Sequence, residues 1–328
     1  MRYIMILASF AALLYACGFA LAQETAAPAT EPLADSPLFH WQPAAEGFVL
    51  EPGPAGAWDE HIRERMWVLY EDGQFKAWYA GWQGEYDLDR ENLVHLGYAT
   101  SPDGIHWTKH PGNPIFTKRW VEDICVLKVD DVYYMYVEDE SKGDTVVHLL
   151  TSTDGLDWKE EGNVLEKEAG STWESDWVGT ALVWKEGALG LMLYEGGEPG
   201  DTALATSFDG KKWLRSDRNP VLTEGVGWDS ELTAPDSVVK RDGLYYLFYH
   251  ARGDAWRSGI AVSKDLHNWT RYPGNPIAEC PSPVVVEADG KTLLYITHEE
   301  KDGKNGILVF APGTTSGATV LPRLNEKG

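Results

Sequence analysis

A seven-residue phrase recurs four times along this chain of 328 residues, and its spacing limits what the chain can fold into. Each copy begins with Ser-x-Asp and ends with Trp, at 101–107, 152–158, 207–213 and 263–269. The steps from Trp to Trp are 51, 55 and 56 residues. A period of this size indicates one supersecondary unit copied around a ring or along a stack. Asp-Gly ahead of Trp is typical of a tight turn that buries the indole on the next strand.

Between the phrases lie pairs of apolar runs, each pair joined by a Gly or Asp turn. The pairs are 66–70 with 75–79, 125–129 with 133–136, 181–184 with 191–194, 237–240 with 245–249, and 284–286 with 293–296. Aromatic and β-branched residues dominate these runs, which favours strands joined by hairpins. No window of ten or more residues shows helical periodicity. Each repeat therefore predicts a blade of four antiparallel strands.

Five pairs of runs stand against four complete phrases, and the missing copy is found near the N-terminus. Residues 36–41 (Ser-Pro-Leu-Phe-His-Trp), followed by 48–50, echo 101–107 followed by 114–116, one residue short. An N-terminal strand that completes the last blade would close the ring and leave no open sheet edge. The sequence therefore predicts an all-β protein, a five-bladed β-propeller over residues 36–318 with a C-terminal tail at 319–328.

The N-terminus indicates an exported protein. Arg2 precedes an apolar stretch that ends in Ala20-Leu21-Ala22, which is typical of a signal peptide over residues 1–22. The alternative is a lipoprotein signal cut before Cys17, because residues 14–17 loosely resemble a lipobox. Residues 23–35 are typical of a disordered leader. We expect a secreted or periplasmic protein with no transmembrane segment in the mature chain.

Composition limits the partners. The formal net charge of −23 disfavours nucleic acid and anionic membranes, whose phosphates would be repelled, and suits a neutral substrate. Fifteen Trp and fifteen Tyr suit sheet packing or a surface that stacks on sugars. Cys125 and Cys280 are interpreted as two small buried thiols. We expect a monomer with a carbohydrate partner, no cofactor and no metal, since no zinc spacing or phosphate loop is present.

The segments just before the innermost strands are acidic, and Trp accompanies the acids in four of the five repeats. Carboxylates converging on an indole-lined pocket suit glycosidic bond cleavage, where one acid protonates the leaving oxygen and a second attacks or activates water. Crowding also pushes their pKa values apart. The candidate catalytic residues are Asp59, Asp123, Asp176, Asp236 and Glu279.

An architectural role is the alternative for the acids that belong to the repeat. Trp58-Asp59 and Trp228-Asp229 occupy matching positions, and in this interpretation Asp caps a turn while Trp packs between blades. Residues that break the symmetry, such as Asp123, are stronger catalytic candidates, because the repeat does not explain their presence. The candidate substrate-binding residues are Trp58, Arg63, Trp177, Glu231, His250 and His298.

Further polar residues lie near strand ends. His61, like His250 and His298, could face the channel and bind sugar hydroxyls or border water or a cation. Arg252 and Arg257 could bind an anionic group, although salt bridges to neighbouring acids are the favoured interpretation.

These features together resemble the five-bladed propeller glycosidases, namely glycoside hydrolase families 43, 32 and 68 and relatives such as family 130. Residues 234–249 are similar to the family 43 blade in which an aspartate ahead of a Gly-Tyr-Tyr hairpin lies in the site. Glu279-Cys280-Pro281 resembles the family 32 sequence whose glutamate is the general acid. The resemblance implies Glu279 as the acid and Asp236 as the carboxylate that orients it or stabilises the transition state.

The chain also departs from those families, which place their three acids in the first three blades. It has neither an Asn-Asp-Pro-Asn-Gly nor an Arg-Asp-Pro motif. Counting blades from the N-terminus instead implies Asp59 as the base, Asp123 as the modulator, and Asp176 or Glu174 as the acid. Both assignments stay open at this point.

The resemblance implies a secreted glycoside hydrolase acting on an arabinose-, xylose- or fructose-type poly- or oligosaccharide. One alternative is a non-catalytic carbohydrate-binding propeller, which would keep the Trp surface without a carboxylate pair. The other is a family 130-like phosphorylase, which uses one acid and binds phosphate through basic residues. The acidic segments and the expected secretion count against the phosphorylase.

Overall fold

The computed structural model describes residues 33–84, 94–140, 144–174, 176–197, 199–300 and 303–313. Over this part of the chain it consists of strands β1 to β20 and one short 3-10 helix, Pro37–Phe39. The expected signal peptide (1–22), the lipobox at Cys17, nearly all of the expected leader (23–35) and the tail (319–328) lie outside the described residues.

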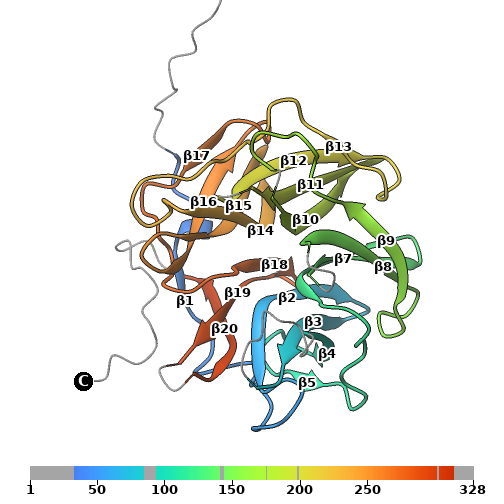
Figure 1. Ribbon diagram of the computed structural model, residues 1–328. Coiled ribbons are helices and arrows are strands. Elements are labelled where there is room, and N and C mark those ends of the chain that lie inside the picture. The colour runs from blue at the N-terminus through green and yellow to red at the C-terminus, as the bar shows by residue number, and fades with distance from the viewer. Residues whose placement is uncertain are drawn as a thin grey trace, which may run out of the picture. The chain divides into compact units, whose positions relative to one another are not determined.

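Five sheets of four antiparallel strands form the blades of a propeller (Figure 1). Blade one consists of β2 (His61–Glu71), β3 (Gln74–Trp82), β4 (His95–Ser101) and β5 (Thr108–Lys109). Blade two consists of β6 (Glu122–Val129), β7 (Val132–Asp139), β8 (Val146–Ser152) and β9 (Lys159–Leu165). Blade three consists of β10 (Val178–Glu186), β11 (Leu189–Gly196), β12 (Asp201–Ser207) and β13 (Leu214–Arg215). Blade four consists of β14 (Leu232–Arg241), β15 (Leu244–Arg252), β16 (Trp256–Ser263) and β17 (Trp269–Arg271). Blade five consists of β18 (Val284–Ala288), β19 (Lys291–Glu299), β20 (Asn305–Pro312) and β1 (Trp41–Pro43).

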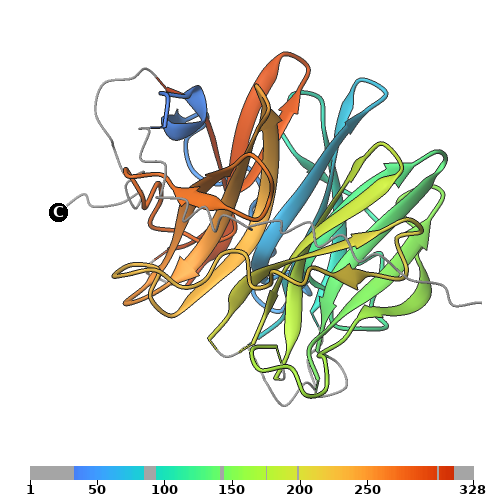
Figure 2. The same ribbon diagram turned by 90° about the horizontal axis from the view of Figure 1, so that it is seen from above.

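The first strand of each blade is the innermost, and these strands form a closed ring. Contacts run from β2 to β6, β10, β14 and β18, and from β18 back to β2. Figure 2 shows the same blades turned by 90°, with neighbouring blades packed face to face. Aromatic side chains fill the space between blades: Trp78 of blade one packs against Tyr133 and Trp158 of blade two. The predicted all-β propeller is confirmed.

The N-terminal segment supplies the fourth strand of the last blade, as predicted. In β1, Trp41 pairs with Pro312 and Gln42 pairs with Ala311 of β20. The Trp41 indole donates to the carbonyl of Leu38, just as the Trp107 indole donates to the carbonyl of Gly104. Residues 36–41 are therefore the fifth copy of the phrase.

The phrase itself is a hydrogen-bonded turn. Ser101 Oγ accepts from the backbone N–H of Gly104 at 2.9 Å, and Asp103 Oδ1 accepts from the N–H groups of Ile105 and His106, also at 2.9 Å. Gly104 has a φ of 80°, which L side chains rarely adopt. Ser and Asp recur because their side chains satisfy backbone donors that the turn leaves without partners.

Candidate functional site

A cavity of about 1560 Å³ lies where the innermost strands β2, β6, β10 and β14 begin, beside the segment that precedes β18. Acidic and aromatic side chains dominate its lining. The acids and the histidines among them are Glu60, Glu64, Glu122, Asp123, Glu138, Glu195, Glu279, Glu299, Glu300, His61, His250 and His298, and the indoles are Trp82, Trp177 and Trp256. Such a mixture of apolar walls and converging polar groups is typical of a ligand site.

A bulge near the start of four innermost strands presents side chains to this cavity. Pairing shifts register between Arg63 and Trp67 in β2, and the same happens at 122–125, 179–182 and 235–237 in β6, β10 and β14. Glu64, Asp123 and Thr180 have φ values of 52°, 44° and 46° at these bulges. Bulges re-aim side chains, and a left-handed φ at a residue other than glycine is strain that clusters at functional sites.

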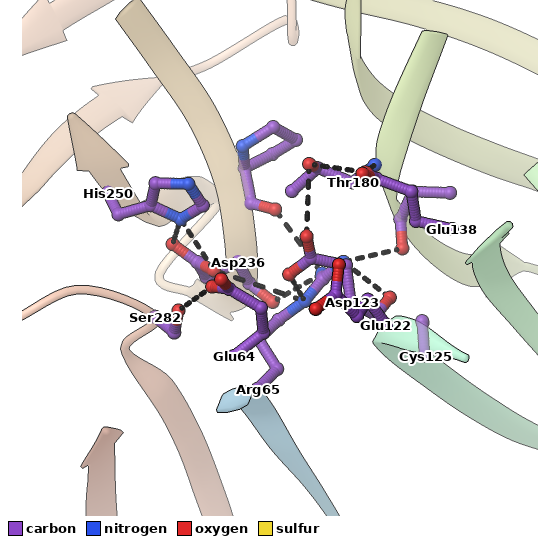
Figure 3. Close-up of polar contacts among 12 residues, drawn as sticks. Glu64, Arg65, Glu122, Asp123, Cys125, Glu138, Thr180, Asp236, His250 and Ser282 are labelled. Carbon is purple, nitrogen blue, oxygen red and sulfur yellow. Dashed lines mark hydrogen bonds and ion pairs between the residues drawn. The ribbon is translucent and has the colours of Figure 1, made fainter. Parts of the chain in front are cut away.

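Arg65 crosses the centre of the ring and forms the floor of the site (Figure 3). It is fully buried, yet its guanidinium reaches three other blades. Its Nε donates to Asp123 Oδ1 at 3.2 Å, and its Nη2 donates to the carbonyls of Asp123 and Ala181 at 2.7 and 3.3 Å. Its Nη1 donates to the carbonyls of Pro235 and Asp236 at 3.3 Å. One charged side chain thus fixes three bulges relative to one another.

Three carboxyl groups converge on the hydroxyl of Thr180, and Figure 3 shows two of them, those of Asp123 and Glu138. Thr180 Oγ1 lies 3.3 Å from Asp123 Oδ2, 3.2 Å from Glu138 Oε2 and 3.0 Å from Glu195 Oε2. One hydroxyl carries one proton and cannot donate to all three. Like charges this close cannot all stay ionised in a buried site, so the cluster holds protons.

The pKa values in the cavity are pushed in opposite directions. Burial raises the pKa of Asp123 to about 6, with Arg65 opposing it, and raises the pKa of Glu195 to about 8. Burial would also raise the pKa of Glu64, but Arg63 and then His250 outweigh it, so the pKa of Glu64 falls below its usual value. At neutral pH the site therefore contains protonated and ionised carboxyl groups side by side.

His250 carries a positive charge next to a buried carboxylate. Its Nδ1 lies 2.9 Å from Asp236 Oδ2. Burial alone would lower the pKa of His250, but Asp236 and then Asp123 raise it to about 10. Asp236 is fully buried below the cavity lining, between His250 and Arg65. The predicted Asp236 thus lies at the site but supports it from beneath.

Most of the predicted site residues meet at this cavity. Asp123, Glu279, Arg63, Trp177, His250 and His298 all line it. Glu279 contacts Arg257 Nε at 2.8 Å, and Arg257 also binds Asp254. The pairing of Arg252 with Glu231 and of Arg257 with its acids confirms the expected salt bridges.

Other predicted residues lie elsewhere. Asp176 is exposed outside the lining, and Glu231 is half exposed in its ion pair with Arg252. Trp58 and Asp59 line a separate pocket beside blade one. The structure does not bring these four residues to the central cavity.

Asp59 and its counterparts belong to a repeated clamp. In blades one, three and four, the acid after Trp accepts from a Tyr hydroxyl twenty residues later and pairs with a cation of the outermost strand. The sets are Asp59 with Tyr79 and Lys109, Glu174 with Tyr194 and Arg215, and Asp229 with Tyr249 and Arg271. This placement favours the architectural interpretation of the Trp-acid pairs, Glu174 included.

Sequence reasoning missed Glu64, Arg65, Glu138 and Glu195. A pattern in the sequence could have identified Glu138 and Glu195. Counted from the hairpin turn, the seventh residue of the second strand is polar in blades two to five: Glu138, Glu195, His250 and Thr297 in turn. Aligning the five hairpins would have placed these polar residues at one height of the ring.

The two cysteines of the described chain are buried and form no disulfide, as expected. Cys125 Sγ lies 3.4 Å from the carbonyl of Val183, and burial raises the pKa of its thiol to about 11. Cys280 Sγ lies 3.1 Å from His298 Nδ1 in the cavity wall. Within the described ranges, no group of three His, Cys, Asp or Glu is placed to hold a metal ion. None of the helices in those ranges is long and apolar enough to cross a membrane.

Comparison with known proteins supports this fold. No family model matches the chain. A 1,2-beta-oligomannan phosphorylase of Thermoanaerobacter sp. (strain X514) is 27% identical over 252 residues, which are 72% of this chain and 79% of the relative. The chain spans about half (48%) of the length of three other curated relatives that it matches.

Solved structures share the architecture at low identity. A glycosyl hydrolase from Bacteroides ovatus matches 86% of this chain and 96% of its own, with a TM-score of 0.68 and 18% identity. A structure reported for the family 130 mannoside phosphorylases, which contain glycoside hydrolases that target beta-1,2 mannosidic linkages, matches 87% and 96%, with a TM-score of 0.65 and 17% identity. The resemblance to the five-bladed propeller superfamily of glycoside hydrolases and phosphorylases is confirmed, while the finer likeness to family 43 stays a prediction.

Proposed function

We propose that this chain is a glycoside hydrolase that cleaves a β-mannosidic bond of an oligosaccharide in the central cavity. The observation that carries the proposal is the set of carboxyl groups, presented by strand bulges, whose pKa values are pushed apart. The relative that acts on 1,2-beta-oligomannan and the solved structure linked to beta-1,2 mannosidic linkages support the choice of sugar. A cavity of about 1560 Å³ has room for several sugar rings.

Asp123 is assigned as the general acid. It lines the cavity, sits on a strained bulge and has a pKa raised to about 6, close to an ordinary working pH. It would protonate the oxygen of the leaving sugar. Glu279 is the rival from the family 32 resemblance, and it pairs with Arg257 at 2.8 Å much as Asp123 pairs with Arg65 at 3.2 Å. Asp123 is preferred because it lies on a strained bulge and shares the hydroxyl of Thr180 with two further carboxyl groups.

Glu64 is assigned as the base that activates water. Its pKa is lowered, so it is ionised when Asp123 is protonated. It accepts from Ser282 Oγ at 3.0 Å and contacts Arg63 Nε at 3.0 Å, which holds the carboxylate in place at the cavity wall. An ionised carboxylate facing a protonated one is the arrangement that acid–base cleavage of a glycoside requires.

The charge of the lining favours water over phosphate as the attacking group. Among the described residues that line the cavity, Arg63 is the one arginine or lysine, and it already contacts Glu64 and Glu122. The protonated His250 is likewise paired, with Asp236. A phosphate dianion would meet several carboxylates, some of them charged, at a high electrostatic cost. Phosphorolysis is the second candidate, and the comparison with known proteins supports it more directly than hydrolysis, because the relative with 27% identity is a phosphorylase.

The test is a cleavage assay on β-1,2-mannooligosaccharides, with arabinan, xylan, fructan and aryl glycosides alongside, with and without inorganic phosphate. Hydrolysis releases free sugars only, whereas phosphorolysis yields a glycosyl phosphate. We expect free mannose at a rate that does not depend on phosphate, with Asp123→Asn and Glu64→Gln inactive but folded.

If cleavage depended strictly on phosphate, the chain would be a phosphorylase and not a hydrolase. Cleavage of another polysaccharide would correct the sugar but keep the reaction. Binding of oligosaccharides without any cleavage would make the chain a carbohydrate-binding propeller and overturn the proposal.

A further inference from the structure

A second pocket, of about 520 Å³, lies beside the clamp of blade one. It shares no lining residue with the central cavity. Its walls include the indoles of Trp58 and Trp107, and its polar groups include Lys109, Asp59 and Asn113. The segment 49–54 closes one side and is fixed to the last blade, since the Val49 N–H donates to the carbonyl of Ile307 at 2.8 Å.

The repeat explains why the space is open in this blade. Lys109, Arg215 and Arg271 occupy one register position, opposite Ala99, Ala205 and Ala261. In blades three and four the guanidinium binds the acid with Nε and donates through Nη2 to a carbonyl of the preceding loop, that of Glu166 or Thr223. The fork of arginine thereby fills the gap between strand and loop.

Blade one has a lysine at this position. Lys109 Nζ donates to Asp59 Oδ2 at 2.5 Å, and this one nitrogen cannot span to the loop as a guanidinium does. The side chain keeps 30% of its surface exposed. The gap that arginine fills in the sister blades is therefore left as a pocket with a cation, a carboxylate and an amide at its base.

We propose that this pocket binds a neutral oligosaccharide, at a site separate from the central cavity. Two half-buried indoles offer flat apolar faces on which the C–H face of a sugar ring can pack. The ion-paired Lys109 and Asp59 carry no net charge together and offer both donors and acceptors to hydroxyl groups. An anionic ligand would gain nothing from a lysine whose charge a carboxylate already balances.

The test uses the full-length protein in native gels cast with mannan, arabinan, xylan or fructan, and isothermal titration with an oligosaccharide of the polysaccharide that retards it. The central variant is Lys109→Arg, which keeps the charge and the ion pair but places a guanidinium in the pocket. Trp107→Ala removes one wall. The matched control is Arg215→Lys, the reverse exchange at the same register position in blade three.

We expect Lys109→Arg and Trp107→Ala to weaken retardation about tenfold or more, with turnover of a short aryl glycoside unchanged. Arg215→Lys should bind as the wild type does. The inference would be overturned if Lys109→Arg and Trp107→Ala were both retarded as strongly as the wild type. It would also be overturned if no gel retarded the wild type. Loss of retardation in a protein that cleaves no glycoside would sustain this site while the proposed hydrolase fails.

Discussion

Arg65 on β2 binds Asp123 on β6 twice, through Nε to the carboxylate at 3.2 Å and through Nη2 to the backbone carbonyl at 2.7 Å. This pair couples the floor of the propeller to the residue assigned as the acid. The same guanidinium that holds the bulge of Asp123 in its strained backbone conformation also moderates the rise in the pKa of its carboxyl group.

Replacing Arg65 should destabilise the protein severely. Arg65→Met leaves the carbonyls of three blades without their donor and Asp123 without its counter-charge, so we expect a loss of about 3–5 kcal/mol in the free energy of unfolding. Denaturant unfolding measures it. Arg252→Met, which breaks the exposed pair with Glu231, should cost only about 0–1 kcal/mol. Equal losses in both variants would refute the central role of Arg65.

Activity should fall as the pH rises through the pKa of Asp123. The acid must be protonated to work, and its pKa of about 6 predicts a decline in kcat/KM above about pH 6. Asp123→Asn should lower kcat/KM by a factor of about 10² to 10⁴ below pH 6, where the acid of the wild type is protonated, and should abolish this limb. A pH–rate profile of each protein checks this. An alkaline limb that survives in Asp123→Asn would show that another group is the acid.

Stability should also fall between about pH 5 and pH 8. Burial raises the pKa of Glu195 from its usual 4.5 to about 8 in the folded protein, so the unfolded chain releases this proton first and becomes relatively more stable as the pH rises through that window. Glu195→Gln, which mimics the protonated form, should narrow the difference in Tm between the two pH values.

The control for Glu195 is Glu161→Gln. The lysines 159 and 211 lower the pKa of Glu161 to about 2, so its contribution is present above about pH 4.5 and is lost only as the pH falls further. Glu161→Gln should therefore leave the difference in Tm between pH 5 and pH 8 unchanged. If both variants narrow it equally, the effect does not come from the buried cluster.

The clamp acids should matter for stability and not for chemistry. Glu174 is fully buried and holds Tyr194 and Arg215, so Glu174→Gln should cost about 1–3 kcal/mol of unfolding free energy. Its kcat/KM, measured well below the melting temperature, should stay within about twofold of the wild type. A loss of activity without a loss of stability would restore Glu174 as a catalytic candidate.

Trp256 should contribute to binding of longer substrates. It lines the cavity, is 42% exposed and packs edge-on against His250 at 5.5 Å between ring centroids. Trp256→Ala should raise KM by about three- to tenfold for an oligosaccharide that spans the cavity, through loss of a stacking face. A disaccharide should be affected less, and a uniform drop in kcat for both would contradict a binding role.

The repeat made the fold predictable, because each blade carries its own hairpins and its own phrase. Asp123 could be singled out because it breaks the symmetry. Glu64 and Arg65 escaped because β2 begins at His61, five residues before the apolar run that marked it. The bulge then shifts the alternation of side chains, so that counting by twos from the core residues puts Glu64 on the wrong face.

The clamp acids illustrate the reverse error, in which the sequence indicated a site residue that the structure places elsewhere. Asp59 was a candidate acid because it lies beside an indole, although its place in the repeat already favoured an architectural role, and its partners Tyr79 and Lys109 lie twenty and fifty residues further along the chain. Spacing within one segment could not reveal them. Comparing the outermost strands of several blades, where a cation recurs two residues after the phrase, would have exposed the architectural role.

The pairing of β1 with β20 ties residue 41 to residue 312. A ribosome therefore has to deliver nearly the whole sequence before the ring can shut, and until then β1 has no partner strand and its backbone groups are open to other chains. Contacts between such distant residues form slowly because closing a long loop costs entropy. The final closure, and not the formation of single blades, should set the pace of folding and the period in which aggregation competes with it.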